Sequence, residues 1–169
     1  MTSTRSHCAL VTSRLLFALM PTKGSFPVCE FDSSKLFLRL ERLVDGHVQA
    51  IEPVVEEIMK LVIEKGCAGD KEFEIGLALR ESLANAIVHG CENDPDKKVQ
   101  VCVSCDDERG ILIVVRDPGE GFDPKSLPNP TVGQNIFSSQ GRGIFLISQL
   151  MDKVQFERGG TEIRMVKRQ

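Results

Sequence analysis

The sequence predicts an α+β fold, a two-layer sandwich in which a mixed, mostly antiparallel sheet is covered on one face by helices. Three observations lead to this prediction. Apolar runs of strand length alternate with segments whose apolar residues recur at helical spacing. The expected strands come in hairpin pairs, which favours antiparallel pairing. Helices with one apolar stripe and a sheet with one apolar face must then pack as two layers.

Residues 1–24 are interpreted as a disordered tail, or as the result of a start codon placed too early with Met20 as the true start. The basic and serine-rich character of this stretch faintly resembles a targeting peptide, but Arg14 interrupts its apolar run. Residues 25–169 are expected to form a single domain, because no linker or repeat divides them.

The first half of this domain is expected to contain strands followed by a helix. A short strand is predicted over residues 26–31, and a second begins at Leu36, where Leu36, Leu38 and Leu40 alternate with other residues and share a buried face. Residues 51–62 carry apolar side chains at helical spacing. Pro53 fits the first turn of this helix and Gly66 ends it.

The second half begins with a helix that Asp70 caps and that runs to about His89, before Gly90. Two strands follow, over residues 99–104 and over the continuous apolar run 111–115, which is expected to be central in the sheet. A long loop rich in Gly, Pro and Asn precedes a helix with apolar residues at 144, 147, 150 and 151. A hairpin over 154–167, turning at Gly159 and Gly160, completes the fold.

The composition predicts a soluble, cytoplasmic protein. Apolar residues make up 41% and charged residues 27% of the chain, the formal net charge is -3, and no basic block suggests nucleic-acid binding. No segment is long and apolar enough for a membrane span. The six cysteines are irregularly spaced and are interpreted as reduced thiols. Cys102 and Cys105 are interpreted as packing residues, because an i, i+3 pair in a strand points to opposite faces.

Three segments contain residues suited to chemistry. Glu81 and Asn85 are four residues apart and therefore emerge together from an otherwise mostly apolar helix. Asp117 follows the apolar strand and precedes Gly119 and Gly121, so a hydrogen-bond acceptor stands in a loop whose backbone can approach a flat ligand. Each segment also has an ordinary structural interpretation, as a satisfied polar pair or as a turn.

The third segment is a Gly-Arg-Gly sequence, Gly141 to Gly143, at the start of the last helix. Free backbone N–H groups and the helix dipole make such a start an anion site, and Arg142 can add a charged contact. The segment fits neither a phosphate-binding P-loop, which needs a Lys and a Ser or Thr, nor a dinucleotide-binding fingerprint, which needs a parallel βαβ unit.

The order of these segments resembles that of the GHKL ATPases, also called the Bergerat fold, over residues 36–167. The resemblance implies that Asn85 binds Mg²⁺, that Glu81 is the catalytic base, and that Asp117 binds the adenine amino group. It further implies that glycines shape the pocket and its lid and that Thr161 lies beside the adenine. The glycines concerned are Gly119, Gly121, Gly141 and Gly143. The short lid, about residues 122–140, departs from the family, and Arg142 is our own candidate for the γ-phosphate contact.

Within that superfamily the chain is most similar to the anti-sigma-factor serine kinases, whose helix motif reads ExxxNAxxHG as here. The resemblance implies ATP and Mg²⁺ as ligands, an anti-anti-sigma (STAS) protein as phosphorylation target, and a sigma factor as competing partner. It also suggests a homodimer, for which residues 36–40 could provide an edge strand. The alternative is a non-catalytic module that binds ATP only to order its lid and acts by partner binding.

Overall fold

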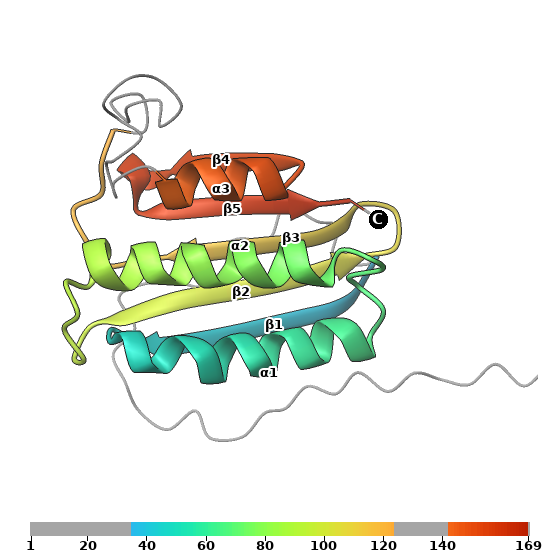
Figure 1. Cartoon of the computed structure of the whole chain (residues 1–169), viewed down its shortest axis with the longest axis horizontal. Coiled ribbons are helices and arrows are strands. Elements are labelled where there is room, and N and C mark those ends of the chain that lie inside the picture. Colours follow the sequence, from blue (N-terminus) through green and yellow to red (C-terminus); the bar gives the residue numbers. More distant parts are fainter. Residues whose placement is uncertain (1–34, 124–141, 169) are drawn as a thin grey trace, which may run out of the picture.

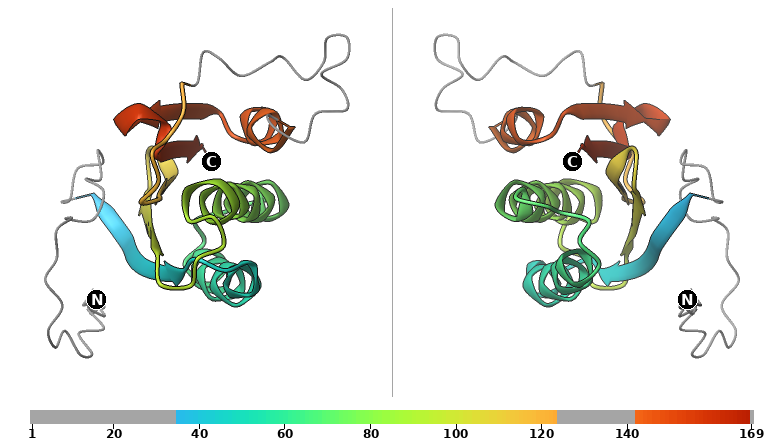
Figure 2. Two further views of the ribbon diagram at one scale, coloured as in Figure 1. Left: turned by 90° about the vertical axis from the view of Figure 1, so that its left-hand side faces the viewer. Right: turned by 90° about the vertical axis from the view of Figure 1, so that its right-hand side faces the viewer.

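The computed structural model describes residues 35–123 and 142–168. Its sheet contains five strands in the order β1-β2-β3-β5-β4, and each described pair of neighbours is antiparallel. Three helices lie side by side on one face of this sheet (Figures 1 and 2). The predicted two-layer α+β sandwich is therefore confirmed. The elements are β1 (Leu36–Asp45), α1 (Ile51–Glu64), α2 (Glu72–Asn85), β2 (Lys98–Asp106), β3 (Gly110–Arg116), α3 (Arg142–Leu150), β4 (Lys153–Glu157) and β5 (Glu162–Lys167).

The main core lies between the helices and the inner face of the sheet. Ile58 of α1, Leu79 of α2 and Ile147 of α3 are fully buried against strand residues such as Ile113 and Met165. Burial of a large aliphatic side chain contributes about 1.5–3 kcal/mol to folding. The predicted central strand, β3, is the third of the five strands and all its residues from Gly110 to Val115 are buried.

Helix α1 and the last hairpin follow the sequence prediction closely. Pro53 lies in the first turn of α1, and Gly66, with a φ of 72°, follows the end of this helix. Strands β4 and β5 are joined by a short 3-10 turn, Arg158–Gly160, in which Gly159 and Gly160 both have positive φ. These two glycines are needed there because other residues rarely adopt this conformation.

The prediction for the first strand was wrong in one respect. The register of β1 against β2 shifts between Leu36 and Leu38, so that a local irregularity separates these two residues. As a result Leu38 and Leu40 pack against the main core, whereas Leu36 packs against a separate apolar cluster on the other face of the sheet. An extra residue in one strand reverses the faces of the residues before it, which simple alternation cannot anticipate.

The predicted cap of α2 was also wrong. The helix starts at Glu72, its N-cap is Lys71, and no side chain caps it. Asp70 is one residue too early for the cap position, and its carboxylate accepts a hydrogen bond from Lys71 Nζ at 3.2 Å. Glu72 and Glu74 instead place negative charge in the first turn, where the helix dipole favours it.

The chain stays helical beyond α2, as predicted, but it changes its hydrogen-bonding pattern. Residues Ala86–Gly90 form one turn of π-helix, directly after Asn85. Single π-turns of this kind widen a helix and are frequent at functional sites.

The prediction that the cysteines are reduced thiols was wrong for one pair. Cys67, in the α1–α2 connection, forms a disulfide with Cys105 of β2, and their Cα atoms are 6.0 Å apart. The spacing in sequence, 38 residues, gave no indication of this pair. Cys102 and Cys105 do point to opposite faces of β2, since Cys105 belongs to the main core and Cys102 to the second apolar cluster.

Three sequence predictions fall outside the described residues: the strand over 26–31, the tail 1–24, and Gly141 with most of the loop before α3. Among residues 35–123 and 142–168, no helix combines the length and the apolar character that crossing a bilayer requires.

Candidate functional site

Glu81 and Asn85 lie on the face of α2 that meets the start of α3, and both are half-buried. A Cβ atom placed on Gly143 would lie 3.0 Å from Glu81 Oε2 and 3.2 Å from Asn85 Nδ2. The structure therefore places the carboxylate of Glu81 and the carboxamide of Asn85 beside Gly143, at the start of α3. The missing side chain at Gly143 allows the two helices to approach at this point.

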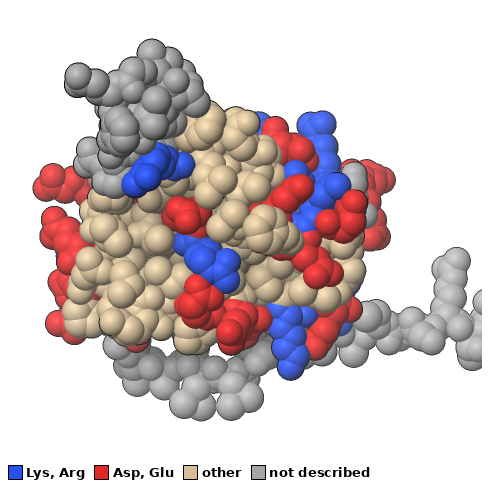
Figure 3. All heavy atoms as spheres, in the orientation of Figure 1, with Lys and Arg blue, Asp and Glu red and all other residues tan. Residues whose placement is uncertain are grey.

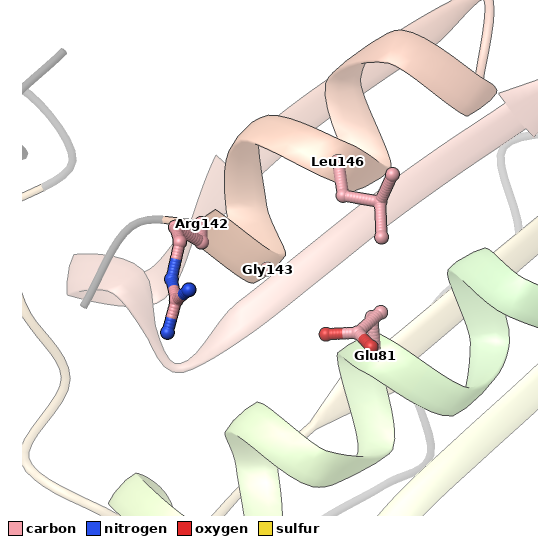
Figure 4. A pocket seen from close by; sticks show the side chains of 4 residues that line it. All are labelled: Glu81, Arg142, Gly143 and Leu146. Carbon is pink, nitrogen blue, oxygen red and sulfur yellow. The ribbon is translucent and has the colours of Figure 1, made fainter. Parts of the chain in front are cut away.

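A cavity of about 300 Å³ opens between α2 and α3, lined by Glu81, Arg142, Gly143 and Leu146. Figure 4 shows Glu81 and Arg142 on opposite helices at the two sides of this space. Arg142 is exposed and is the first residue of α3, so its guanidinium and the positive end of the helix dipole occupy the same region. Leu146 was not predicted as a site residue. It lies about one helical turn after Gly143, so the helical spacing already placed both residues on the same face of α3.

Asp117 stands immediately after β3 and is held by the backbone on both sides. Its backbone N–H donates to Thr161 O at 3.0 Å, and one carboxylate oxygen accepts from the N–H of Gly119 at 2.8 Å. The carboxylate is half-buried, and this burial raises its pKa, against the opposing effect of the hydrogen bond from Gly119. An acceptor is thus fixed in a partly dehydrated place, where a hydrogen bond to a ligand is stronger than in water.

Gly90 explains how Asp117 reaches the helix that carries Asn85. A Cβ atom on Gly90 would overlap the carboxylate of Asp117, and one on Gly119 would lie 2.8 Å from the Cα of Gly90. The end of the π-turn, the end of β3 and the following loop therefore meet only because these two positions are glycine. The sequence analysis included Gly90 only as the last residue of the ExxxNAxxHG motif and did not predict its packing against Asp117.

The other side of Asp117 is formed by the β4–β5 turn. Thr161 is half-buried, its hydroxyl donates to Arg158 O at 3.0 Å, and a Cβ on Gly121 would lie 3.0 Å from its methyl group. Gly121 has a φ of 80°, which favours glycine. The predicted glycines after Asp117 and the predicted Thr161 therefore line the same loop junction.

Two residues near this junction were not predicted. Phe122 donates its backbone N–H to Gly159 O at 2.8 Å and packs edge-on against Phe156, with ring centroids 5.4 Å apart. Cys91 is fully buried after the π-turn, and burial together with the negative charge of Asp117 raises the pKa of its thiol. No sequence pattern distinguished either residue from ordinary core residues.

The described residues contain no group of three or more His, Cys, Asp or Glu side chains that could hold a metal ion. A metal at Asn85 would therefore need its remaining ligands from bound phosphates and water, which is the usual situation of Mg²⁺ at nucleotide sites. The donor set of a carboxamide oxygen, with the Glu81 carboxylate one turn away, suits such a hard cation.

A fixed acceptor, a glycine-lined loop and a helix start facing a carboxamide together define a nucleotide-binding α+β domain. Comparison with known proteins agrees: residues 40–167 match the histidine kinase-like ATPase domain. The chain belongs to this family, and ATP binding is implied by the membership.

Several relatives are similar over the same region. The anti-sigma F factor of Oceanobacillus iheyensis is 35% identical over 105 residues, which cover 58% of this chain and 70% of the relative. The anti-sigma F factor of Heyndrickxia coagulans is 32% identical over 93 residues, covering 52% and 63%. The serine-protein kinase RsbW of Staphylococcus epidermidis is 29% identical over 110 residues, covering 60% and 69%. The resemblance to anti-sigma-factor kinases predicted from the motifs is confirmed.

Proposed function

We propose that the protein is a Mg-ATP-dependent serine/threonine kinase of the anti-sigma-factor type. The observation that supports this most directly is the placement of Glu81 and Asn85 against Gly143, at the mouth of a cavity that Arg142 also lines. A base, a metal ligand and a phosphate contact are the three groups that phosphoryl transfer to a hydroxyl requires.

The nucleotide would be held at two places. Asp117 accepts a hydrogen bond from the adenine amino group, beside Thr161 and the backbone of Gly119 and Gly121. Gly143, together with Gly141, lets backbone N–H groups approach the phosphates. Guanine should bind poorly, because it carries an oxygen where adenine carries the amino group, and this oxygen would face the acceptor Asp117.

The phosphate end would be arranged by α2 and α3. Asn85 would hold Mg²⁺, which neutralises phosphate charge when it is bound. Glu81 is positioned to accept the proton of the attacking serine hydroxyl, and Arg142 to contact the γ-phosphate. Glu81 and Asn85 are one helical turn apart, so the proton acceptor and the metal ligand face the same space.

The names of the relatives support an inference about the binding partners of this protein. We infer a small anti-anti-sigma (STAS) protein as the phosphorylated substrate and a sigma factor as the competing ligand, in a cytoplasmic setting. The relatives named anti-sigma F factor and serine-protein kinase support this assignment for a domain of this size.

Two substitutions on α2 separate chemistry from binding. Glu81→Gln should keep nucleotide affinity but slow phosphotransfer by about 10²–10⁴-fold, the usual cost of a missing general base. Asn85→Ala should lose both Mg-ATP affinity and transfer. The measurements are calorimetric titration with ATP and GTP, with and without EDTA, and phosphoserine formation on candidate partners.

The outcomes distinguish the alternatives. Transfer at the wild-type rate by Glu81→Gln would exclude Glu81 as the base. Equal affinity for GTP and ATP would contradict the role given to Asp117. Tight ATP binding by the wild type without transfer to any partner would instead favour a regulatory module that acts by binding alone.

A further inference from the structure

A row of polar side chains crosses the sheet from β2 to β4, at the end that carries the candidate site. Arg116 of β3 donates from Nε to Glu162 Oε2 at 2.6 Å, its Nη2 lies 2.6 Å from the same oxygen, and its Nη1 donates to Gln100 Oε1 of β2 at 3.3 Å. Arg164 of β5 donates to Glu162 Oε1 at 2.8 Å and lies 3.6 Å from Glu157 Oε2 of β4. Each carboxylate oxygen of Glu162 therefore has its own guanidinium, and hydrogen bonds between charged groups are about twice as strong as neutral ones.

The ion pair between Arg116 and Glu162 closes the β3–β5 ladder. These two residues are the last partners in the antiparallel register of the two strands. The next contact along the chain is the hydrogen bond from the Asp117 N–H to Thr161 O, at 3.0 Å. The ion pair thus stands one residue away from both Asp117 and Thr161 and ties together the strand ends that carry them.

Arg116 and Asp117 point to opposite sides of the sheet. Side chains alternate along a strand, and Arg116 comes two residues after Val114, which belongs to the apolar cluster on the face away from the helices. The carboxylate of Asp117 instead meets Gly90 at the end of the π-turn, on the helical side. Arg116 is therefore directed away from a ligand held by Asp117, and it acts on such a ligand through the backbone.

The turn before Thr161 explains why these strand ends need support. Arg158, Gly159 and Gly160 all have positive φ, and a Cβ on Gly159 would meet nothing within 4 Å. Glycines restrict the backbone weakly, and the ends of strands open at a lower free-energy cost than their centres. A site that selects its ligand by a hydrogen bond needs the acceptor held to within about 0.5 Å. The side chains of the last ladder pair supply this restraint.

We propose that Arg116 and Glu162 are positioning residues for adenine recognition, holding Asp117 and Thr161 at a fixed separation. This inference rests on the adenine contact of Asp117 in the proposed function. Isolated surface ion pairs contribute little, but forked arginine–carboxylate pairs within a network are the exception. At metal sites, loss of such an indirect partner costs about 10–100-fold in affinity, and we expect the lower end of that range here.

The test variant is Arg116→Gln, which removes the guanidinium and keeps a polar side chain. The matched control is Arg42→Gln, which breaks the ion pair of Arg42 with Glu57 between β1 and α1, where Arg42 Nε donates at 2.9 Å. Amide hydrogen exchange of the nucleotide-free, full-length protein is followed by NMR. The affinities for Mg-ATP and Mg-GTP are measured by calorimetry.

We expect the amide of Asp117 to exchange at least about tenfold faster in Arg116→Gln, because its hydrogen bond to Thr161 O opens more often. The amide of Ile113, in the middle of β3, should change far less. Affinity for ATP should fall by about tenfold while that for GTP does not fall, so that the preference for ATP falls by about the same factor. Arg42→Gln should keep the wild-type exchange rates at Asp117 and the wild-type preference.

An unchanged exchange rate at Asp117, or a preference for ATP equal to that of the wild type, would overturn the proposal. A parallel loss of ATP and GTP affinity would also overturn it, because it would show a merely structural effect. A wild type that binds both nucleotides equally would contradict the proposed function instead. Exchange at Asp117 distinguishes the two failures, since it is measured without nucleotide.

If Arg116→Gln does not fold, Arg116→Lys is the deciding variant. Lysine keeps the positive charge but replaces the planar fork, which contacts both Glu162 and Gln100, with a single ammonium group. Faster exchange at Asp117 together with a weaker preference for ATP supports the positioning role. Wild-type values for either measurement overturn it.

Discussion

At Gly90 the last helical turn lies against the carboxylate of Asp117 with no space for a side chain. We expect Gly90→Ala to displace Asp117, to lower the free energy of unfolding by about 1–3 kcal/mol, as overpacking does, and to weaken ATP binding. The matched control is Gly76→Ala in α2, whose new Cβ would lie 3.7 Å from Met59, an ordinary contact. This control should raise stability by up to about 1 kcal/mol through helix propensity. Calorimetry and thermal denaturation of both variants check the prediction, and unchanged ATP affinity in Gly90→Ala would contradict it.

The carboxylate of Asp117, for which we propose a role in binding adenine, carries a cost to folding. Because burial raises the pKa of this carboxyl above the ordinary value of 3.8, ionising it opposes folding. This cost is absent below pH 3.8, grows as the pH rises through the higher pKa of the folded state, and is complete above it. We expect Asp117→Asn to be more stable than the wild type at neutral pH and to converge with it below pH 3.8, in urea titrations across pH.

The same variant should lose the preference for adenine over guanine nucleotides, because an amide can donate where the carboxylate only accepts. Asp96→Asn, which changes an exposed acidic residue away from the site, serves as the control and should keep the preference. Unaltered selectivity in Asp117→Asn would argue against adenine recognition at this position, whatever happens to stability.

Among the elements, the connection between α1 and α2 is tied to β2 by the Cys67–Cys105 disulfide. Closing a loop of 38 residues in the unfolded chain stabilises the fold by about 3–4 kcal/mol in the chain-entropy description. We expect dithiothreitol to lower the melting temperature of the wild type. The double variant Cys67→Ala/Cys105→Ala should melt at a lower temperature than the oxidised wild type and show no response to dithiothreitol. An equal response of both proteins would show that the effect has another source.

The element order could be read from the sequence because apolar periodicity depends on local geometry. Strand β3 is a continuous apolar run, and α1 has helical spacing between Pro53 and Gly66, so both were predicted at nearly their observed limits. The irregularity after Leu36 and the start of α2 beyond Asp70 depend instead on how the chain pairs and packs with distant segments. Pairing and packing with distant segments override the preferences of the local sequence.

The site could be predicted to a similar degree. The residues of the candidate site were identified because their types and order form motifs. Glu81 and Asn85 do lie on one face of α2, and Asp117 does contact Thr161. Residues that only support these groups were missed. The burial of Cys91 behind Asp117 and the contact of Phe122 with Phe156 arise from folding of distant segments, and no spacing in the chain encodes them.

For the whole molecule, the fold separates the proposed nucleotide site from the edge strand β1. Asp117, Thr161 and α3 all lie toward the β3–β5–β4 side of the sheet, whereas β1 is the opposite edge (Figure 1). Acidic and basic residues are interspersed over the helical face in the space-filling view, which shows no large area of one sign there (Figure 3). Charge on that face therefore gives no reason to expect a nucleic-acid surface.

The edge strand β1 makes a specific prediction about assembly. Its pairing within the described chain is with β2, and it carries two exposed apolar side chains, Phe37 at 39% and Leu43 at 55%. An edge with exposed apolar residues is a template for pairing with a second copy. We expect light scattering at micromolar concentration to report a dimer for the wild type and a monomer for the variant Phe37→Lys/Leu43→Lys.

The control variant is Ile63→Lys, which changes an exposed apolar residue of α1 and should remain dimeric. Because β1 is remote from Asp117, the monomeric variant should bind ATP as the wild type does, and a monomeric wild type would refute the dimer without affecting the nucleotide site.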